Sequence, residues 1–170
     1  MPLIKQGKVT RDPWTFVPDG EDIPMSMPVI VTLERWMAER DRLTGHNAPF
    51  GIRLRSDEQP EDIADDVHRF DVIALEFPAF KDGRAYSSAR LLRERFGYEG
   101  ELRAVGNVLR DQLMFMVRCG FDAFELDKDA DAERWTEAID EISVFYQPAA
   151  DDRTPVPALR KRGIVGSWAY

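Results

Sequence analysis

Short apolar runs alternate with longer amphipathic segments along most of the chain. The runs are rich in β-branched residues, which favour strands. Five strands are predicted in this way: Pro28–Leu33, Phe50–Leu54, Asp71–Phe77, Glu101–Val105 and Asp122–Leu126. The third run, DVIALEF, is almost continuously apolar, which indicates a central strand covered on both faces.

The segments between these strands carry helix signals. Helix starts are predicted from capping residues or from proline at four places: Thr32, Pro60, Ser87 or Ser88, and Asn107. The helix after Thr32 should end near Leu43, the one after the serines at Gly97 and the one after Asn107 at Gly120. The buried stripe of this third helix is predicted to be Leu109, Leu113, Met116 and Val117.

Three regions follow from this pattern. Residues 1–27 contain four prolines and two glycines, and we expect an ordered arm with a short ribbon around Leu3 to Val9. Residues 28–147 form a single α/β domain, which closes with an amphipathic helix over Asp129 to Tyr146. Residues 148–170 are proline-rich and then basic, which predicts an extended C-terminal tail.

The alternation of strands and helices defines the fold class as α/β, with about five parallel strands and flanking helices. Two sheets fit this alternation, an open doubly wound sheet and a partial barrel of the TIM type. A full eight-stranded TIM barrel typically needs about 250 residues, more than the 170 present. In both cases ligands are expected at the carboxyl ends of the strands.

Composition narrows the classes of function. The chain has 23 basic and 31 acidic residues, a net charge of −8, which argues against nucleic-acid and anionic-membrane partners. The apolar runs are far shorter than the ~20 residues that span a bilayer, and residues 1–14 lack the apolar segment of a secretory signal. We therefore expect a cytoplasmic protein.

A possible anion site lies in the loop between the third strand and its following helix. Free N–H groups at a helix start, together with Lys81, Arg84 and Ser87, provide the groups that hold a small anion. Asp82 and Tyr86 belong to the same loop. A second explanation stays open, in which this is a solvated loop whose serines only cap the helix.

Arg90, Asn107 and Arg110 extend this predicted anion-binding face. Arg110 falls in the first turn after Asn107, where the helix dipole disfavours a cation, and such a local conflict sometimes marks function. An ion pair of Arg110 with Asp111 or Glu101 explains the same residue without a ligand.

Two carboxylates are candidate proton-transfer groups, Asp111 and Glu125. Glu125 and also Glu76 fall within apolar strands, where a pKa can be perturbed, although a salt bridge to arginine is the commoner reason for such residues.

The sequence has no metal-binding spacing, no G-x-G-x-x-G after a strand and no P-loop motif. Its single cysteine, Cys119, cannot form an internal disulfide and is expected to be a small buried residue. No metal and no cofactor are therefore predicted.

The stretch FKDGRAYSSARLLRERFGYEGELRAVGNVLRDQL, followed by RCGFDAFEL, resembles a bacterial domain-of-unknown-function family, number 934. Members are commonly labelled as oxidoreductases of sulfite reduction. The resemblance covers roughly Leu3 to Phe145, and the motif positions are Asp82, Gly83, Arg84, Tyr86, Ser87, Arg90, Leu91, Arg93, Gly106, Asn107, Asp111, Gln112, Cys119, Gly120, Phe121, Asp122 and Glu125. It implies a role near assimilatory sulfate reduction and no established reaction.

Three hypotheses follow. The first is an accessory protein of sulfite reduction without its own redox cofactor, which contacts sulfite reductase or another sulfate-assimilation enzyme, or handles an oxyanion. The second is a small barrel-like enzyme in which Arg84 and Arg110 bind an anion and Asp111 or Glu125 moves a proton. The third is a pure interaction module that docks through Trp168 to Tyr170.

Overall fold

Eight strands form one mixed sheet in the computed structural model, which describes residues 2–127, 134–135, 148–150 and 154–161. The strands are β1 (Leu3–Lys5), β2 (Lys8–Thr10), β3 (Thr15–Phe16), β4 (Val29–Thr32), β5 (Phe50–Leu54), β6 (Val72–Phe77), β7 (Glu101–Gly106) and β8 (Ala123–Glu125). Their order is β2-β1-β8-β7-β6-β5-β4-β3. Strands β3 to β8 pair in parallel, whereas β1 is antiparallel to both β2 and β8.

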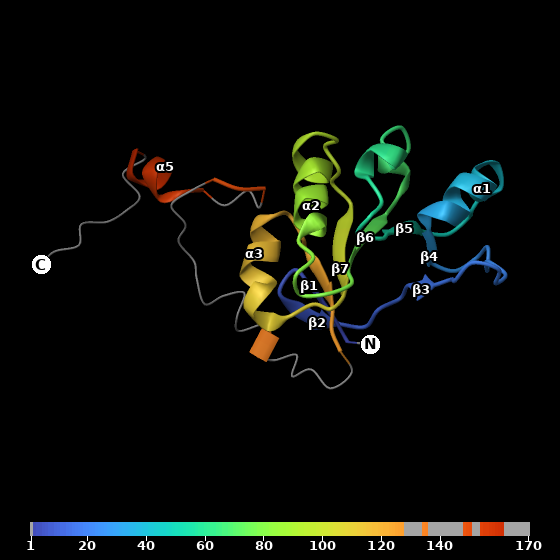
Figure 1. The fold of residues 1–170 in the computed structure, drawn as a ribbon, viewed down its shortest axis with the longest axis horizontal. Coiled ribbons are helices and arrows are strands. Elements are labelled where there is room, and N and C mark those ends of the chain that lie inside the picture. The colour runs from blue at the N-terminus through green and yellow to red at the C-terminus, as the bar shows by residue number, and fades with distance from the viewer. Residues whose placement is uncertain (1, 128–133, 136–147, 151–153, 162–170) are drawn as a thin grey trace, which may run out of the picture.

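The helical elements that the structure describes are short (Figure 1). They are α1 (Leu33–Leu43), α2 (Arg84–Glu94), α3 (Leu113–Arg118) and α5 (Val156–Lys161), with 3-10 turns η1 (Pro60–Ile63), η2 (Val67–Arg69) and η3 (Arg110–Gln112). The helix predicted from Pro60 is thus two 3-10 turns. None of the helices in the described part of the chain is long and apolar enough to cross a bilayer.

The prediction of an α/β fold is confirmed, and the five predicted strands are present as β4 to β8. The sheet is larger than predicted, because the arm adds β1, β2 and β3 to it. The predicted ribbon is the β1–β2 hairpin, and Ile4 of β1 is fully buried.

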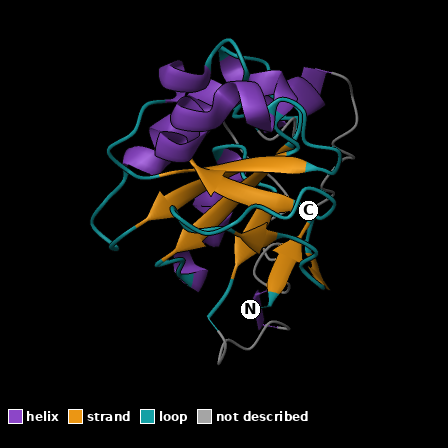
Figure 2. Cartoon of the chain, turned by 90° about the vertical axis from the view of Figure 1, so that its right-hand side faces the viewer, coloured by secondary structure: helices purple, strands orange, loops and turns teal. Residues whose placement is uncertain are grey.

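The doubly wound alternative is wrong. From β3 to β8 the strands follow one another across the sheet without the reversal that a doubly wound sheet requires. Right-handed crossovers in one direction place the helices on one face. The main core agrees, because Trp36, Leu92 and Met116 from the helices pack in one cluster with Ile52 and Ile73 from the strands. The sheet is a curled half-barrel (Figure 2).

The curl brings the two edges of the sheet near each other. Edge strands β2 and β3 are joined by residues 11–14 alone, which we call the strap (Figure 1). The strap and its flanking residues reach at most about 17 Å, whereas eight strands at about 4.8 Å spacing measure roughly 34 Å along the sheet. Gly51 allows β5 to pack closely on its neighbours, because a Cβ there would lie 3.0 Å from both the Ile30 side chain and the Val72 carbonyl oxygen.

An ion cluster holds the strap across the inner face of the curl. Arg103, at mid-strand in β7, is 1% exposed and donates two hydrogen bonds to the Asp12 carboxylate of the strap (2.7 and 3.2 Å). Its Nε also donates to Glu101 (2.8 Å), which pairs with Lys5 of β1 (2.7 Å). The two buried charges of the cluster, Arg103 and Glu101, therefore each have opposite partners, as burial requires.

The helix starts show what sequence signals can miss. Thr32 caps α1 as predicted, accepting a hydrogen bond from the Arg35 N–H (3.1 Å). Neither Ser87 nor Ser88 is an N-cap, because α2 already begins at Arg84 after Gly83. Asn107 is not a cap either, since the chain continues beyond it before η3 and α3 begin.

Two predicted segments fall largely outside the described residues. Of the helix expected over Asp129 to Tyr146, only residues 134 and 135 are described, and Trp135 is buried. In the C-terminal region the described residues include α5, where extended chain was predicted.

Candidate functional site

The segments that leave the carboxyl ends of β6 and β7 form the candidate site. We call residues 78–83 and 107–112, with the exposed side chains that follow them on α2 and α3, the carboxyl edge. The two segments start side by side, because the Asn107 N–H donates to the Phe77 carbonyl (2.7 Å). Gly106 makes this approach possible with φ +90°, and a Cβ there would lie 2.6 Å from the Phe77 oxygen.

Arg84 is held by two neighbouring side chains, one from its own loop and one from the segment after β5. Its guanidinium donates to Asp82 at 2.6 and 3.0 Å and to the Ser56 hydroxyl at 2.9 Å. The hydrogen bonds from Arg84 hold the pKa of the Asp82 carboxyl far below its ordinary value of 3.8. Asp82 therefore stays ionised and already neutralises the cation that was predicted to bind an anion.

The start of α2 is likewise occupied. The Asp82 carboxylate accepts a hydrogen bond from the Arg84 N–H (3.2 Å), which places a negative charge at the positive end of the helix. Ser87 lies inside α2 and is exposed, and the Ser88 hydroxyl donates back to the Arg84 carbonyl (3.3 Å). Lys81 is exposed beside this loop.

The remaining predicted anion-binding residues do not converge on Arg84. Arg90 forms a surface pair with Glu94 on its own helix (2.8 Å). Arg110 lies in η3 and donates to the Arg134 carbonyl (2.9 Å) instead of pairing with Asp111 or Glu101. Asn107 is exposed at the start of the β7–η3 connection.

Tyr86 links the two connecting segments through its ring. The ring lies 5.1 Å from that of Phe77 in β6 and 4.7 Å from that of Phe115 in α3. Burial, followed by the nearby Cys119 and Asp111, raises the pKa of the Tyr86 phenol, so this residue acts as a neutral packing group.

The two predicted proton-transfer carboxylates lie in different places. Asp111 is exposed in η3, whereas Glu125 is partly buried in β8 opposite Leu3. In the described part of the chain, no hydrogen bond or ion pair joins them. Glu76 forms the salt bridge that was considered for it, with Arg53 of β5 (3.1 Å).

Sequence reasoning missed the exposed apolar side chains of this edge. Phe80, Leu109 and Phe115 are 56, 37 and 57% exposed. Leu109 was predicted to be buried, and this is wrong because the helix that would have turned it inward begins later. Phe115 falls outside the predicted apolar stripe, and this was the one available signal that it faces solvent.

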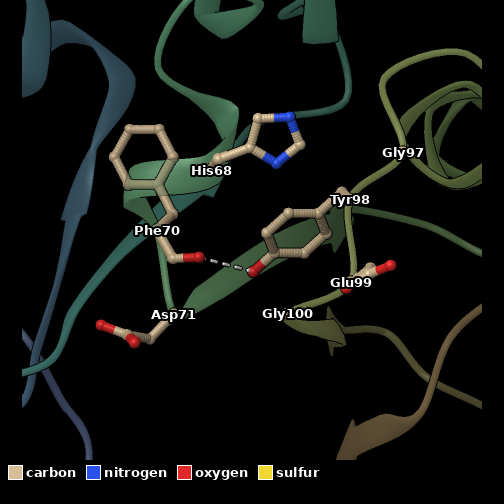
Figure 3. Close-up of a pocket in the computed structure, with 7 residues that line it drawn as sticks. All are labelled: His68, Phe70, Asp71, Gly97, Tyr98, Glu99 and Gly100. Atoms are coloured by element: carbon tan, nitrogen blue, oxygen red, sulfur yellow. Dashed lines mark hydrogen bonds between the residues drawn. The ribbon is translucent and has the colours of Figure 1, made fainter.

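A hollow of about 530 Å³ lies at the opposite, amino ends of the strands (Figure 3). Asp71, Tyr98 and Glu99 contribute to its lining. The carboxylates of Asp71 and Glu99 point away from one another, and the Tyr98 hydroxyl is directed to the Phe70 carbonyl (3.1 Å). These groups do not converge on a common point, so we do not assign this hollow as the site.

Cys119 is buried, as predicted, and burial raises the pKa of its thiol, which disfavours the reactive thiolate. Across the described residues, His, Cys, Asp and Glu side chains form no group of three or more that could hold a metal ion.

The fold and the edge define a small α/β half-barrel protein with an apolar surface at the carboxyl ends of its central strands. The chain belongs to the family described as "Bacterial protein of unknown function (DUF934)", whose model matches residues 51–157. This match covers more than half of the chain and confirms the resemblance carried by Phe80 to Leu126. No curated protein matches the chain.

Proposed function

We propose that the protein is an accessory factor of assimilatory sulfite reduction that contacts sulfite reductase or another sulfate-assimilation enzyme, without a redox cofactor of its own. The pathway is suggested by the family resemblance in the sequence. The mode of action is supported by one observation, the combination of two arginines that are already paired, Arg84 and Arg90, with exposed apolar side chains at the carboxyl edge.

A contact function fits this edge better than oxyanion handling. A tight oxyanion site needs cationic or N–H donors that converge and are free to bind. Arg84 and Arg90 are each paired with a carboxylate of their own chain. Phe80 and Phe115, in contrast, are more than half exposed, and exposed aromatic residues are typical of protein interfaces.

A barrel-like enzyme is the second candidate. It is favoured by the position of Arg53 and Glu76, a half-buried ion pair close to the carboxyl ends of β5 and β6. Glu125 lies near the carboxyl end of β8, and catalytic residues of βα barrels occur at such positions. The interaction-module hypothesis depends on Trp168 to Tyr170, which lie outside the described residues.

Gene deletion tests the pathway. A strain lacking the gene should grow normally on sulfide or cysteine and poorly on sulfate or sulfite, and the intact gene should restore growth. Equal growth on all four sulfur sources would contradict the proposed function.

A thermal-shift titration of the purified protein with sulfite, sulfate and phosphate separates the two candidates. The contact function predicts no selective stabilisation. A ligand at a hundredfold excess over its Kd stabilises a protein by about 2.7 kcal/mol, so a selective shift that is lost in Arg53→Ala would favour the enzyme. Visible absorbance of the purified protein would contradict the absence of a redox cofactor.

A further inference from the structure

We propose that the terminal N–H groups of Arg103 form a carboxylate-binding site on the inner face of the half-barrel, and that Asp12 of the strap is its internal occupant. A ligand with a free carboxylate group binds Arg103 in place of Asp12 and releases the strap. This inference is independent of the proposed function, because that function concerns the carboxyl edge.

The guanidinium of Arg103 is oriented by its own strand. Its Nε donates to the Glu101 carboxylate (2.8 Å), which also lies 2.7 Å from one terminal nitrogen. The two terminal nitrogens donate to the two oxygens of Asp12, at 2.7 and 3.2 Å. A planar fork that faces two oxygens is the arrangement by which arginine recognises carboxylate groups. Because Glu101 already fixes the guanidinium, the site is preorganised for one further carboxylate.

The charges around Arg103 require one anion from outside the sheet. Glu101 is shared between two cations, because Lys5 also pairs with it (2.7 Å). The charged side chains of this part of the sheet, Lys5, Glu101 and Arg103, therefore sum to +1, and Arg103 is only 1% exposed. A buried cation needs a counter-charge, and Asp12 supplies it from the strap. The site thus selects a ligand group with a single negative charge.

The sheet leaves room beside the guanidinium. Arg103 lies in register between Ala74 of β6 and Ala123 of β8, and residues paired in this way point to the same face of a sheet. Both neighbours have only a methyl group, so the adjacent strands place no large side chain next to the terminal N–H groups. A small carboxylate therefore fits where the Asp12 carboxylate lies.

Asp12 can leave this position without any change in the pairing of the central strands. The strap is four residues long and joins β2 and β3, which are edge strands of three and two residues. The Asp12 side chain is 21% exposed, so it lies on the solvent side of the buried guanidinium. Movement of the strap therefore opens a path from solvent to Arg103. A tethered group has a high effective concentration, so a free small carboxylate competes poorly with Asp12 in the wild type.

The test is thermal melting of the full chain in sodium formate, compared with sodium chloride at the same ionic strength. Asp12→Ser removes the carboxylate, and a serine hydroxyl can still accept the hydrogen bond that the Trp14 N–H donates to Asp12 (3.1 Å). Formate should raise the melting temperature of Asp12→Ser saturably, by several degrees, because it binds only the folded state. The wild type should respond to formate and chloride alike.

Two control variants locate the response. Asp12→Ser/Arg103→Met leaves Glu101 paired with Lys5 and should lose the selective effect of formate. Asp82→Ser removes the carboxylate partner of Arg84, whose side chain is 57% exposed, and should show no saturable effect because solvent screens an exposed pair. An equal formate response of Asp82→Ser would mean that any unpaired arginine suffices, and would overturn the built site.

The remaining outcomes also decide the proposal. Equal responses of Asp12→Ser to formate and chloride would overturn the site, as would a formate response that persists in Asp12→Ser/Arg103→Met. If Asp12→Ser does not fold in chloride, formate added during refolding should restore its near-UV circular dichroism, and failure to do so would contradict the site. None of these results depends on the growth phenotype that tests the proposed function.

Discussion

The two ends of the parallel strands are built in different ways. At the amino ends, which we call the amino edge, partly buried polar side chains tie neighbouring segments together. Arg93 donates to the carbonyls of Tyr98, Gly100 and Gly120 and to Asp122, at 2.6 to 3.1 Å. The carboxyl edge instead exposes aromatic side chains, and its Arg84–Asp82 ion pair lies at the surface.

This difference agrees with a general property of βα folds, in which the amino ends of the strands support stability and the carboxyl ends carry function. It also explains why the hollow in Figure 3 is a poor candidate site. Arg93, Asp122 and the Tyr98 hydroxyl at the amino edge already have partners within the chain, whereas the apolar groups at the carboxyl edge have solvent as a neighbour. Stability and contact should therefore respond to different substitutions.

The largest expected loss of stability is at Arg93. Arg93→Ala leaves three carbonyl groups and the Asp122 carboxylate without this donor, and should lower the free energy of unfolding by roughly 3 kcal/mol. The control is Arg90→Ala on the same helix, which removes one exposed pair with Glu94 and should change stability far less. Urea denaturation measures both, and equal losses would refute the assignment of stability to the amino edge.

Gly106 is expected to be the position of the carboxyl edge where a substitution costs most stability. Gly106→Ala combines a left-handed φ with a Cβ 2.6 Å from the Phe77 oxygen, and should cost about 2–3 kcal/mol. Gly97→Ala is the matched control, because its φ is +62° with no atom within 4 Å of the added Cβ, and it should cost about 1 kcal/mol. Thermal unfolding of the two variants isolates the cost of the contact between the added Cβ and the Phe77 oxygen. If Gly106→Ala loses no more stability than Gly97→Ala, β6 and β7 move apart easily.

Tyr98 and Tyr86 allow a direct comparison, because one lies at the amino edge and the other at the carboxyl edge. The Tyr98 hydroxyl is buried between the carbonyls of Phe70 (3.1 Å) and Glu101 (3.2 Å), so Tyr98→Phe should cost about 1–2 kcal/mol. Tyr86→Phe keeps the ring contacts with Phe77 and Phe115 and should change stability by less than about 0.5 kcal/mol. A larger loss at Tyr86 than at Tyr98, in denaturant titrations, would contradict this ordering.

The smallest expected effects on stability come from the titration of two carboxyl groups, Asp122 and Asp82. Their pKa values should lie on opposite sides of the ordinary value of 3.8. Burial raises the pKa of Asp122 at the amino edge, and hydrogen bonds from Arg84 lower the pKa of Asp82 at the carboxyl edge. Asp82 thus contributes stability that is present above pH 3.8 and lost as the pH falls. Asp122 has the opposite sign, so its contribution declines as the pH rises from 3.8 through its folded pKa.

Carboxyl-carbon NMR titration measures both groups. Asp82 should titrate below 3.8 and Asp122 above it, and Arg84→Gln should return Asp82 toward 3.8 without moving Asp122. Ordinary titration of Asp82 in the wild type would show that Arg84 is free, and would revive the predicted anion site.

The strands could be predicted from the sequence, because the apolar runs of β4 to β8 are local signals. The cap at Thr32 was predictable for the same reason. The starts of α2 and α3 were not, since Asp82 takes the role expected of the serines and the tight turn at Gly106 depends on the neighbouring strand. The pairing of β1 with β8 joins residues far apart in the chain, and no local pattern reports it.

For the candidate site, the sequence could predict only which segments leave the carboxyl ends of the strands. The rule that ligands bind at the carboxyl ends of strands selected the segments around Arg84 and Asn107, and these do form the carboxyl edge. The chemistry of these segments was harder to predict, because whether Arg84 is free or paired depends on the rotamers of Asp82 and Ser56. Exposure of Phe115 depends likewise on where α3 begins.

The most direct test of this account is amide hydrogen exchange of the protein alone and with purified sulfite reductase. The account predicts slower exchange in the complex for residues 78–82 and 107–115, with the amino-edge segments 68–72 and 97–101 unchanged. Protection confined to the amino-edge segments would contradict the assignment of contact to the carboxyl edge.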